Sequence, residues 1–263
     1  NENLSTIISL QPLKRFDLDA SIVFSDILMI PYGLGQKITF KKNFGPQLSK
    51  LSLEKIINLE KKDFIKKLNP IYKTIKNIKK KINKNKSVIG FVGAPWTLLV
   101  YMLNRKSPKN NFTLEKIIKD DSIIRLLLNK LEEVICLHVD QQISSGANVI
   151  QIFDSWANLL PNKKLPHYCY ETNFRIVNYI KSKKIPVICF PKGIGKNYVD
   201  FCSIVKPDCL SIDYKINPKW IKKKLNGIPI QGGLDPKILL MENEKIKKNA
   251  EIYLNIFKDY PYI

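Results

Sequence analysis

The feature that most constrains the fold is the alternation of short apolar runs with longer helical segments. Runs rich in β-branched and aromatic residues occupy residues 20–24, 88–92, 148–153, 186–190, 209–212 and 228–231. They are continuously apolar, which is typical of parallel strands covered on both faces. No linker rich in Gly or Ser divides the chain. The pattern therefore predicts an α/β fold built around a parallel sheet.

Helices are expected at both ends of the chain and between the strands. The periodicity of apolar residues places them at residues 4–14, 61–86, 114–144, 168–183, 218–225 and 245–258. The stretch 61–86 is crowded with lysine, but its apolar residues recur at helical spacing. We therefore expect an amphipathic helix with a solvated basic face there.

Each apolar run is followed directly by polar or glycine-rich residues. These junctions read SDIL, GAPWTL, DSWANLLP, PKGIG, DYKINP and GGLDP. In a closed (β/α)8 TIM barrel, all loops at the carboxyl ends of the strands face one mouth, where ligands bind. We expect residues 1–263 to form a single barrel domain with about six of the eight strand units, one unit being absent at each end. An open sheet of six strands is the competing prediction.

The net charge of +21 has three possible origins. They are a nucleic-acid partner, an anionic substrate, and a general abundance of Lys, Asn and Ile. Nucleic-acid surfaces usually mix arginine and stacking aromatic residues into a basic patch, and residues 61–86 contain no arginine. We therefore expect no nucleic-acid partner, although the charge would help to steer a polyanionic small molecule.

Cysteine usage and hydropathy point to a cytoplasmic protein. The five cysteines include no CxxC pair, and the only histidines are His138 and His167. A disulfide framework and a metal site are both disfavoured. No apolar run is long enough to span a bilayer, and residues 1–20 do not have the order of a signal peptide. We expect no membrane partner.

A lone carboxylate, Asp26, interrupts the first junction between apolar Phe24 and Ile27. The simpler interpretation is a cap for the following turn or a partner for a lysine. The functional interpretation is a partly desolvated carboxylate at the barrel mouth, which would accept hydrogen bonds from N–H groups of a ligand.

Two further junctions carry candidate binding residues. In the second, Pro95 suits the first turn of a helix, and Tyr101 lies one to two turns further on, where its phenol would reach the mouth. In the third, Ser155 follows Asp154 with no GxSxG motif and no histidine to activate it. Ser155 is therefore either a hydrogen-bond donor to a substrate carboxylate or an N-cap. The glycines of KGIG match no phosphate-binding motif.

Taken in order and with their separations, the segments SDIL, GAPWTLLVYM, IFDSW, KGIG, IDY and IQGGLDP resemble those of the uroporphyrinogen decarboxylase family. The resemblance spans essentially the whole chain. It implies a (β/α)8 barrel, a cytoplasmic homodimer of the haem biosynthesis pathway, and loss of CO2 from four acetate side chains of uroporphyrinogen III without a metal or organic cofactor.

The resemblance also implies roles for four residues. Asp26 matches the family's motif aspartate, which gathers the N–H groups of the macrocycle and stabilises its protonated form. Tyr101 matches a substrate-contacting tyrosine, and Ser155 matches a serine or threonine that touches a substrate carboxylate. Phe91 aligns with a phenylalanine of the pocket wall.

Some family motifs are missing from these residues. The arginine-bearing RQAGRY and the NLGHG histidine are absent, and Gly233 stands where the family usually has Asn. The loop 103–111 lacks the family's glycines. We expect residues 1–263 to be a piece of a longer protein that binds substrate poorly by itself. Two other functions stay open: a zinc-dependent corrinoid methyltransferase on the same barrel, and a basic nucleic-acid-binding protein.

Overall fold

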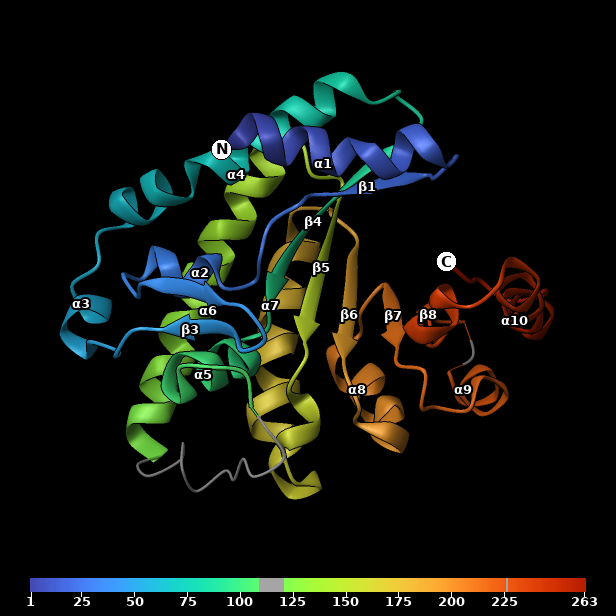
Figure 1. The fold of residues 1–263 in the computed structure, drawn as a ribbon. Helices are drawn as coiled ribbons and strands as arrows, with labels where there is room; N and C mark the ends of the chain where they lie inside the picture. Colours follow the sequence, from blue (N-terminus) through green and yellow to red (C-terminus); the bar gives the residue numbers. More distant parts are fainter. Residues whose placement is uncertain (109–120, 226) are drawn as a thin grey trace.

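The computed structural model describes residues 1–108, 121–225 and 227–263. Its centre is a sheet of six parallel strands in the order β1-β4-β5-β6-β7-β8 (Figure 1). These strands are β1 (Ala20–Ile22), β4 (Ser87–Gly93), β5 (Val149–Asp154), β6 (Val187–Pro191), β7 (Cys209–Ile212) and β8 (Ile230–Gly232). All six predicted strands are present, and the prediction of a parallel α/β sheet is confirmed.

The helices follow the predicted alternation with the strands. They are α1 (Glu2–Arg15), α2 (Met29–Gly33), α3 (Leu53–Ile57), α4 (Lys61–Lys81), α5 (Pro95–Asn104), α6 (Asp121–Ser144), α7 (Glu171–Ser182), α8 (Tyr198–Val205), α9 (Pro218–Lys224) and α10 (Asn243–Ile256). Short 3-10 or π turns occur at Ala157–Leu159, Asn162–Lys164, Pro166–Tyr170, Gly195–Asn197 and Pro236–Leu240. The predicted helix over 114–144 is described from residue 121, and its first residues lie outside the described ranges.

The lysine-rich helix α4 is amphipathic, as predicted. Phe64, Leu68, Ile75 and Ile78 are buried on one side of it, while most of its lysines are exposed. Burial of this apolar stripe accounts for the helix.

A two-stranded antiparallel hairpin, β2 (Ile38–Lys41) and β3 (Gly45–Leu48), was not predicted. Its connection places Asn43 and Gly45 at positive φ, where Asn and Gly are the residues tolerated best. The combination of these two residues is the sequence signal for the turn. The hairpin lies beside α5, and the backbone N–H of Leu48 donates to the carbonyl of Arg105 at 2.8 Å (Figure 1).

The sheet is curled. Gln151 on β5 donates through Nε2 to Oε1 of Gln231, next to Ile230 on β8, at 2.9 Å. Two strands separate β5 from β8, and on a flat sheet three strand spacings would span about 14 Å. Side chains standing on a flat sheet would not meet across that distance, so the strands enclose a concave face.

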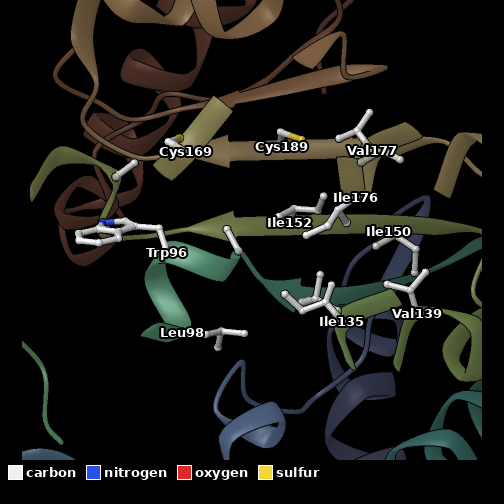
Figure 2. Packing of buried hydrophobic residues seen from close by; sticks show 14 of the residues in the cluster. Trp96, Leu98, Ile135, Val139, Ile150, Ile152, Cys169, Ile176, Val177 and Cys189 are labelled. Carbon is white, nitrogen blue, oxygen red and sulfur yellow. The ribbon is translucent and has the colours of Figure 1, made fainter. Parts of the chain in front are cut away.

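The convex face is packed by helices. Ile150 and Ile152 of β5 belong to one apolar cluster with Ile135 of α6 and Ile176 of α7, and Figure 2 shows these side chains converging between strand and helices. All of them are at most 2% exposed. All five cysteines are free. No helix in the described part of the chain is long and apolar enough to cross a membrane.

After α10 the chain returns to the edge of the sheet. Ile263 donates its N–H to the carbonyl of Ile230 at 2.8 Å, and Ile230 donates to Pro261 at 2.9 Å. Tyr262 bridges Ile230 in the parallel sense. Residues 261–263 therefore pair with β8 as a following strand would.

A side chain from α6 replaces sheet pairing where β1 leaves β4. The last residue of β4 that pairs with β1 is Ile89. Its carbonyl also accepts a hydrogen bond from the N–H of Val23, just after β1. Phe91, two residues later, presents its backbone to the same side. Gln142 accepts from the Phe91 N–H and donates to the Phe91 carbonyl, both at 3.0 Å. Its amide therefore completes the edge of β4 at the point where β1 departs.

We predict that Gln142→Leu destabilises the protein by about 1–3 kcal/mol, because two backbone groups of Phe91 lose their partner. The free energy of unfolding, measured in urea, tests this. Gln141→Leu, on the same helix, is the matched control and should change stability by no more than about 0.5 kcal/mol. Equal effects of the two substitutions would contradict the assignment.

Candidate active site

A cavity of about 620 Å³ runs along β1 and reaches the carboxyl ends of β4 and β5. Its walls are mostly apolar, and they include Ile22 and Phe24, which are 50% and 56% exposed. Large apolar side chains left open to solvent in a concave surface are typical of ligand sites.

Three of the four predicted site residues line this cavity: Asp26, Phe91 and Ser155. They follow, or lie near the end of, three neighbouring strands, β1, β4 and β5. Because parallel strands deliver their carboxyl ends to one edge of the sheet, segments far apart in sequence meet here.

Asp26 is half-buried in the cavity wall. Its Oδ1 accepts from the N–H of Leu28 at 2.8 Å, so the carboxylate caps the following turn. Burial raises the pKa of Asp26, and the Leu28 hydrogen bond opposes this shift. No lysine among the described residues forms an ion pair with Asp26. The capping hydrogen bond uses one carboxylate oxygen and leaves the other to bind a ligand.

Ser155 lies at the cavity without a capping role. The turn that follows it, Ala157–Leu159, has Trp156 at its N-cap, and no side chain caps it. The N-cap interpretation of Ser155 is therefore wrong, and Ser155 lines the cavity with no side-chain hydrogen bond to any described residue.

Phe91 and Phe153 line the cavity, and they continue into a row of phenylalanines that includes Phe190. The rings of Phe91 and Phe153 meet edge to face at 5.6 Å, and those of Phe153 and Phe190 at 6.2 Å. Sequence reasoning had identified only Phe91. All three occupy half-buried positions near the carboxyl ends of neighbouring strands, while Val92, Ile152 and Cys189 beside them are buried. The pairing of the strands, and no local sequence pattern, gives the three rings this shared position.

Tyr101 is placed differently from the other predicted residues. Its ring packs against Trp156 with centroids 5.9 Å apart, and it does not line the cavity. The structure therefore brings Tyr101 next to the Ser155 segment through Trp156, and not to Asp26 directly.

A buried carboxylate fixes the segment that carries Ser155. Asp154 is 1% exposed and accepts from Thr97 Oγ1 at 2.6 Å and from Asn173 Nδ2 at 3.3 Å. Thr97 in turn accepts from the N–H of Trp156 at 3.0 Å. Burial raises the pKa of Asp154, while the donors around it lower that pKa. The network ties β5 to α5 and α7, and sequence reasoning missed it because its members are far apart in the chain.

The KGIG and IDY segments are joined by a hydrogen bond from Gly193 to Asp213. Asp213 Oδ2 accepts from the Gly193 N–H at 2.9 Å and from the Tyr198 hydroxyl at 2.8 Å. The glycine loop therefore binds a carboxylate of the protein itself, that of Asp213. Gly233 adopts φ +93°, a conformation that favours Gly, and a Cβ at this position would lie 2.9 Å from the Tyr253 ring and 3.0 Å from Ile212 Cδ1.

Neither histidine is placed for chemistry at the cavity. His138 is 4% exposed and hydrogen-bonds the Tyr72 hydroxyl at 2.9 Å, and burial lowers the pKa of His138 to about 3. His167 is exposed and pairs with Glu171. The described residues include no group of three or more His, Cys, Asp or Glu side chains that would hold a metal.

Comparison with known proteins identifies the family. The family model described as "Uroporphyrinogen decarboxylase (URO-D)" matches residues 1–263. Proteins named uroporphyrinogen decarboxylase are 38% identical in Rickettsia bellii, over 98% of this chain and 77% of the relative, and 36% identical in Wolbachia pipientis wMel, over 100% and 77%. The chain belongs to the uroporphyrinogen decarboxylase family.

Solved structures confirm the fold at greater distance. A methyltransferase from Methanosarcina mazei superposes with a TM-score of 0.81 at 15% identity, covering 100% of this chain and 79% of that one. A B12-independent methionine synthase from Shewanella matches with a TM-score of 0.56 at 11% identity, over 99% and 78%. At these identities the likeness concerns the fold alone.

We predict that Thr97→Val destabilises the protein by about 1–3 kcal/mol, because the buried Asp154 carboxylate and the Trp156 N–H both lose the hydroxyl. Thr97→Ser keeps the hydroxyl and should retain most of the stability. Urea unfolding of both variants measures the difference. A stable Thr97→Val protein would show that the network does not hold the Ser155 segment.

We predict that Asp26→Asn stabilises the protein at neutral pH. Burial raises the pKa of Asp26, so the ionised carboxylate costs the folded state free energy above the unfolded-state pKa near 3.9, and the cost disappears below it. The gain in melting temperature should therefore shrink as the pH falls from 7 towards 3.

The exposed Asp17 provides the opposite control. A hydrogen bond from Lys86 lowers the pKa of Asp17, so Asp17→Asn should bring no stabilisation at pH 7. A destabilised Asp26→Asn variant would contradict the assignment of a desolvated carboxylate.

Proposed function

We propose that this member of the family converts uroporphyrinogen III to coproporphyrinogen III by removing four acetate carboxyl groups. The observation that carries the proposal is Asp26, a carboxylate in the wall of an apolar cavity with no cationic partner among the described residues. A ligand that brings several N–H donors would satisfy it.

The chemistry needs an electron sink. A proton added to a pyrrole carbon makes the ring cationic, the bond to the acetate carboxylate then breaks, and its electron pair flows into the ring as CO2 leaves. A second proton converts the resulting exocyclic methylene into a methyl group, and the ring loses the first proton. The substrate thus does internally what pyridoxal phosphate does elsewhere, and the proposed reaction uses no metal or organic cofactor.

Asp26 is proposed to stabilise the cationic ring. Its carboxylate would accept hydrogen bonds from the pyrrole N–H groups and place negative charge beside the positive charge that develops. The apolar wall, with Phe91 and Phe153, limits access of water and so strengthens this interaction. The hydrogen bond from Leu28 holds the carboxylate in position before the substrate arrives.

Two hydroxyl groups are proposed to bind substrate carboxylates. Ser155 faces the cavity, and the Asp154–Thr97 network fixes the backbone next to it. Tyr101 packs on Trp156, one residue further along, and would contact a substrate group that extends beyond the cavity.

We further propose that the six strands are an arc of a single (β/α)8 barrel domain. The strands follow one another in sequence order and curl, and residues 261–263 add to β8 in the parallel sense. The relatives are longer than this chain, which covers 77% of the Rickettsia bellii protein. The family resemblance also supports our proposal of a cytoplasmic homodimer.

The test is release of CO2 from uroporphyrinogen by the full-length protein. We predict that Asp26→Ala lowers kcat by roughly 10²- to 10³-fold, the size of effect seen when one preorganised electrostatic contact is removed. The free energy of unfolding should change far less than turnover does, because losing the Leu28 hydrogen bond and removing a desolvated carboxylate act in opposite directions. Asp17→Ala, at an exposed position, should keep full activity.

Two outcomes would reject the proposal. One is full activity of Asp26→Ala with an intact fold. The other is an enzyme that loses activity on treatment with a chelator and recovers it with zinc, which would favour a methyltransferase-type reaction.

A further inference from the structure

A second groove, separate from the candidate active site, lies between the β2–β3 hairpin and the end of α5. It has a volume of about 480 Å³, and hydroxyl and amide side chains line it together with four cations. The cations are Lys37, Lys41, Arg105 and Lys106. We propose that this basic groove binds a small polyanion that carries carboxylate or phosphate groups.

The two sides of the basic groove are held together by the backbone. The Leu48 N–H donates to the Arg105 carbonyl at 2.8 Å, Arg105 Nε donates back to the Leu48 carbonyl at 3.1 Å, and Gln47 bridges Lys106. Arg105 ends α5 in the left-handed conformation, with φ +62°. Because the Nε of Arg105 is bonded to the Leu48 carbonyl, one nitrogen of the guanidinium is held in place, and the other two nitrogens remain to bind a ligand.

The charge of the basic groove is uncompensated. No acidic residue lines it, and within the described ranges none of its four cations forms an ion pair. Lys37 and Lys41 also donate no side-chain hydrogen bond to a described residue. Like charges gathered in one concave surface repel each other, and a bound anion relieves that repulsion.

A groove of the same volume elsewhere in the protein is lined differently. It has a volume of about 480 Å³, lies near the start of α4 and contains Lys55 and Lys67. There three carboxylates, Glu54, Glu60 and Asp63, accompany the two lysines. A groove in the same basic protein is thus balanced, whereas the basic groove contains positive charge alone.

The size of the basic groove suits a compact ligand or one edge of a larger one. A tricarboxylate or a pyrophosphate would place its charges among the four cations. Arg105 ends helix α5, and Tyr101, one turn earlier in that helix, packs on Trp156 next to Ser155. If the proposed function holds, carboxylates of the tetrapyrrole are one source of the anion, and a free small anion is the other.

Isothermal titration of the full-length protein with citrate and with inorganic pyrophosphate, at physiological ionic strength, tests the proposal. We expect saturable binding of at least one probe. The double variant Lys37→Gln, Lys41→Gln should weaken it by at least about tenfold, which corresponds to the loss of one charge-assisted contact. The matched control Lys55→Gln, Lys67→Gln removes the same charge from the balanced groove and should change affinity less than about twofold.

The kinetics then distinguish the two sources of the anion. If the groove binds substrate carboxylates, citrate competes with uroporphyrinogen and the groove variant raises KM with kcat unchanged. If it binds a separate anion, the probe binds and KM does not change. Both outcomes support the groove as a site, and Asp26→Ala should bind the probe like the unaltered protein in either case.

Absence of saturable binding of both probes would overturn the proposal. Equal weakening in the groove variant and the control variant would also overturn it, because it would show that net charge alone attracts the anion. Neither result would affect the decarboxylase assignment, which is tested by release of CO2.

Discussion

The structure depends on the point where β1 separates from β4. Up to Ile89 the two strands share backbone hydrogen bonds, and beyond it Gln142 from α6 takes over the exposed edge at Phe91. The chain that leaves the sheet carries Phe24 and Asp26 to the wall of the cavity. If β1 had continued along β4, Asp26 would be one more strand residue. The edge is satisfied by a side chain, so the departure costs no unpaired backbone group.

Burial and hydrogen bonding act on the pKa of Asp26 in opposite directions. Burial raises the pKa of Asp26, and the Leu28 N–H favours the ionised form. Among the described residues, the hydrogen bond to the carboxylate is the one from the Leu28 N–H, and under our proposal the ligand supplies further donors. Asp154 is nearly inaccessible and is surrounded by Thr97 and Asn173, so it holds structure in place. Two carboxylates at neighbouring strand ends thus have different tasks because their surroundings differ.

Much of the fold could be predicted because apolar runs and helical periodicity are local signals. Six strands and the amphipathic α4 follow from them directly. The β2–β3 hairpin was missed because its strands are short and exposed. At the candidate site, Asp26 and Ser155 could be predicted because each follows a strand end, whereas Phe91 was predicted only from the family resemblance. The Asp154–Thr97–Asn173 network and the row formed with Phe153 and Phe190 depend on how distant segments are brought together, which no local pattern contains. The same reason explains why Tyr101 packs on Trp156 outside the cavity.

The most direct measurement of the central claim is a crystal structure of the full-length protein with the reduced tetrapyrrole product bound. We expect the pyrrole nitrogens to lie within about 2.7–3.2 Å of the Asp26 carboxylate, the distance of an N–H···O hydrogen bond. A macrocycle bound away from Asp26, or one whose nitrogens point away from that carboxylate, would contradict it.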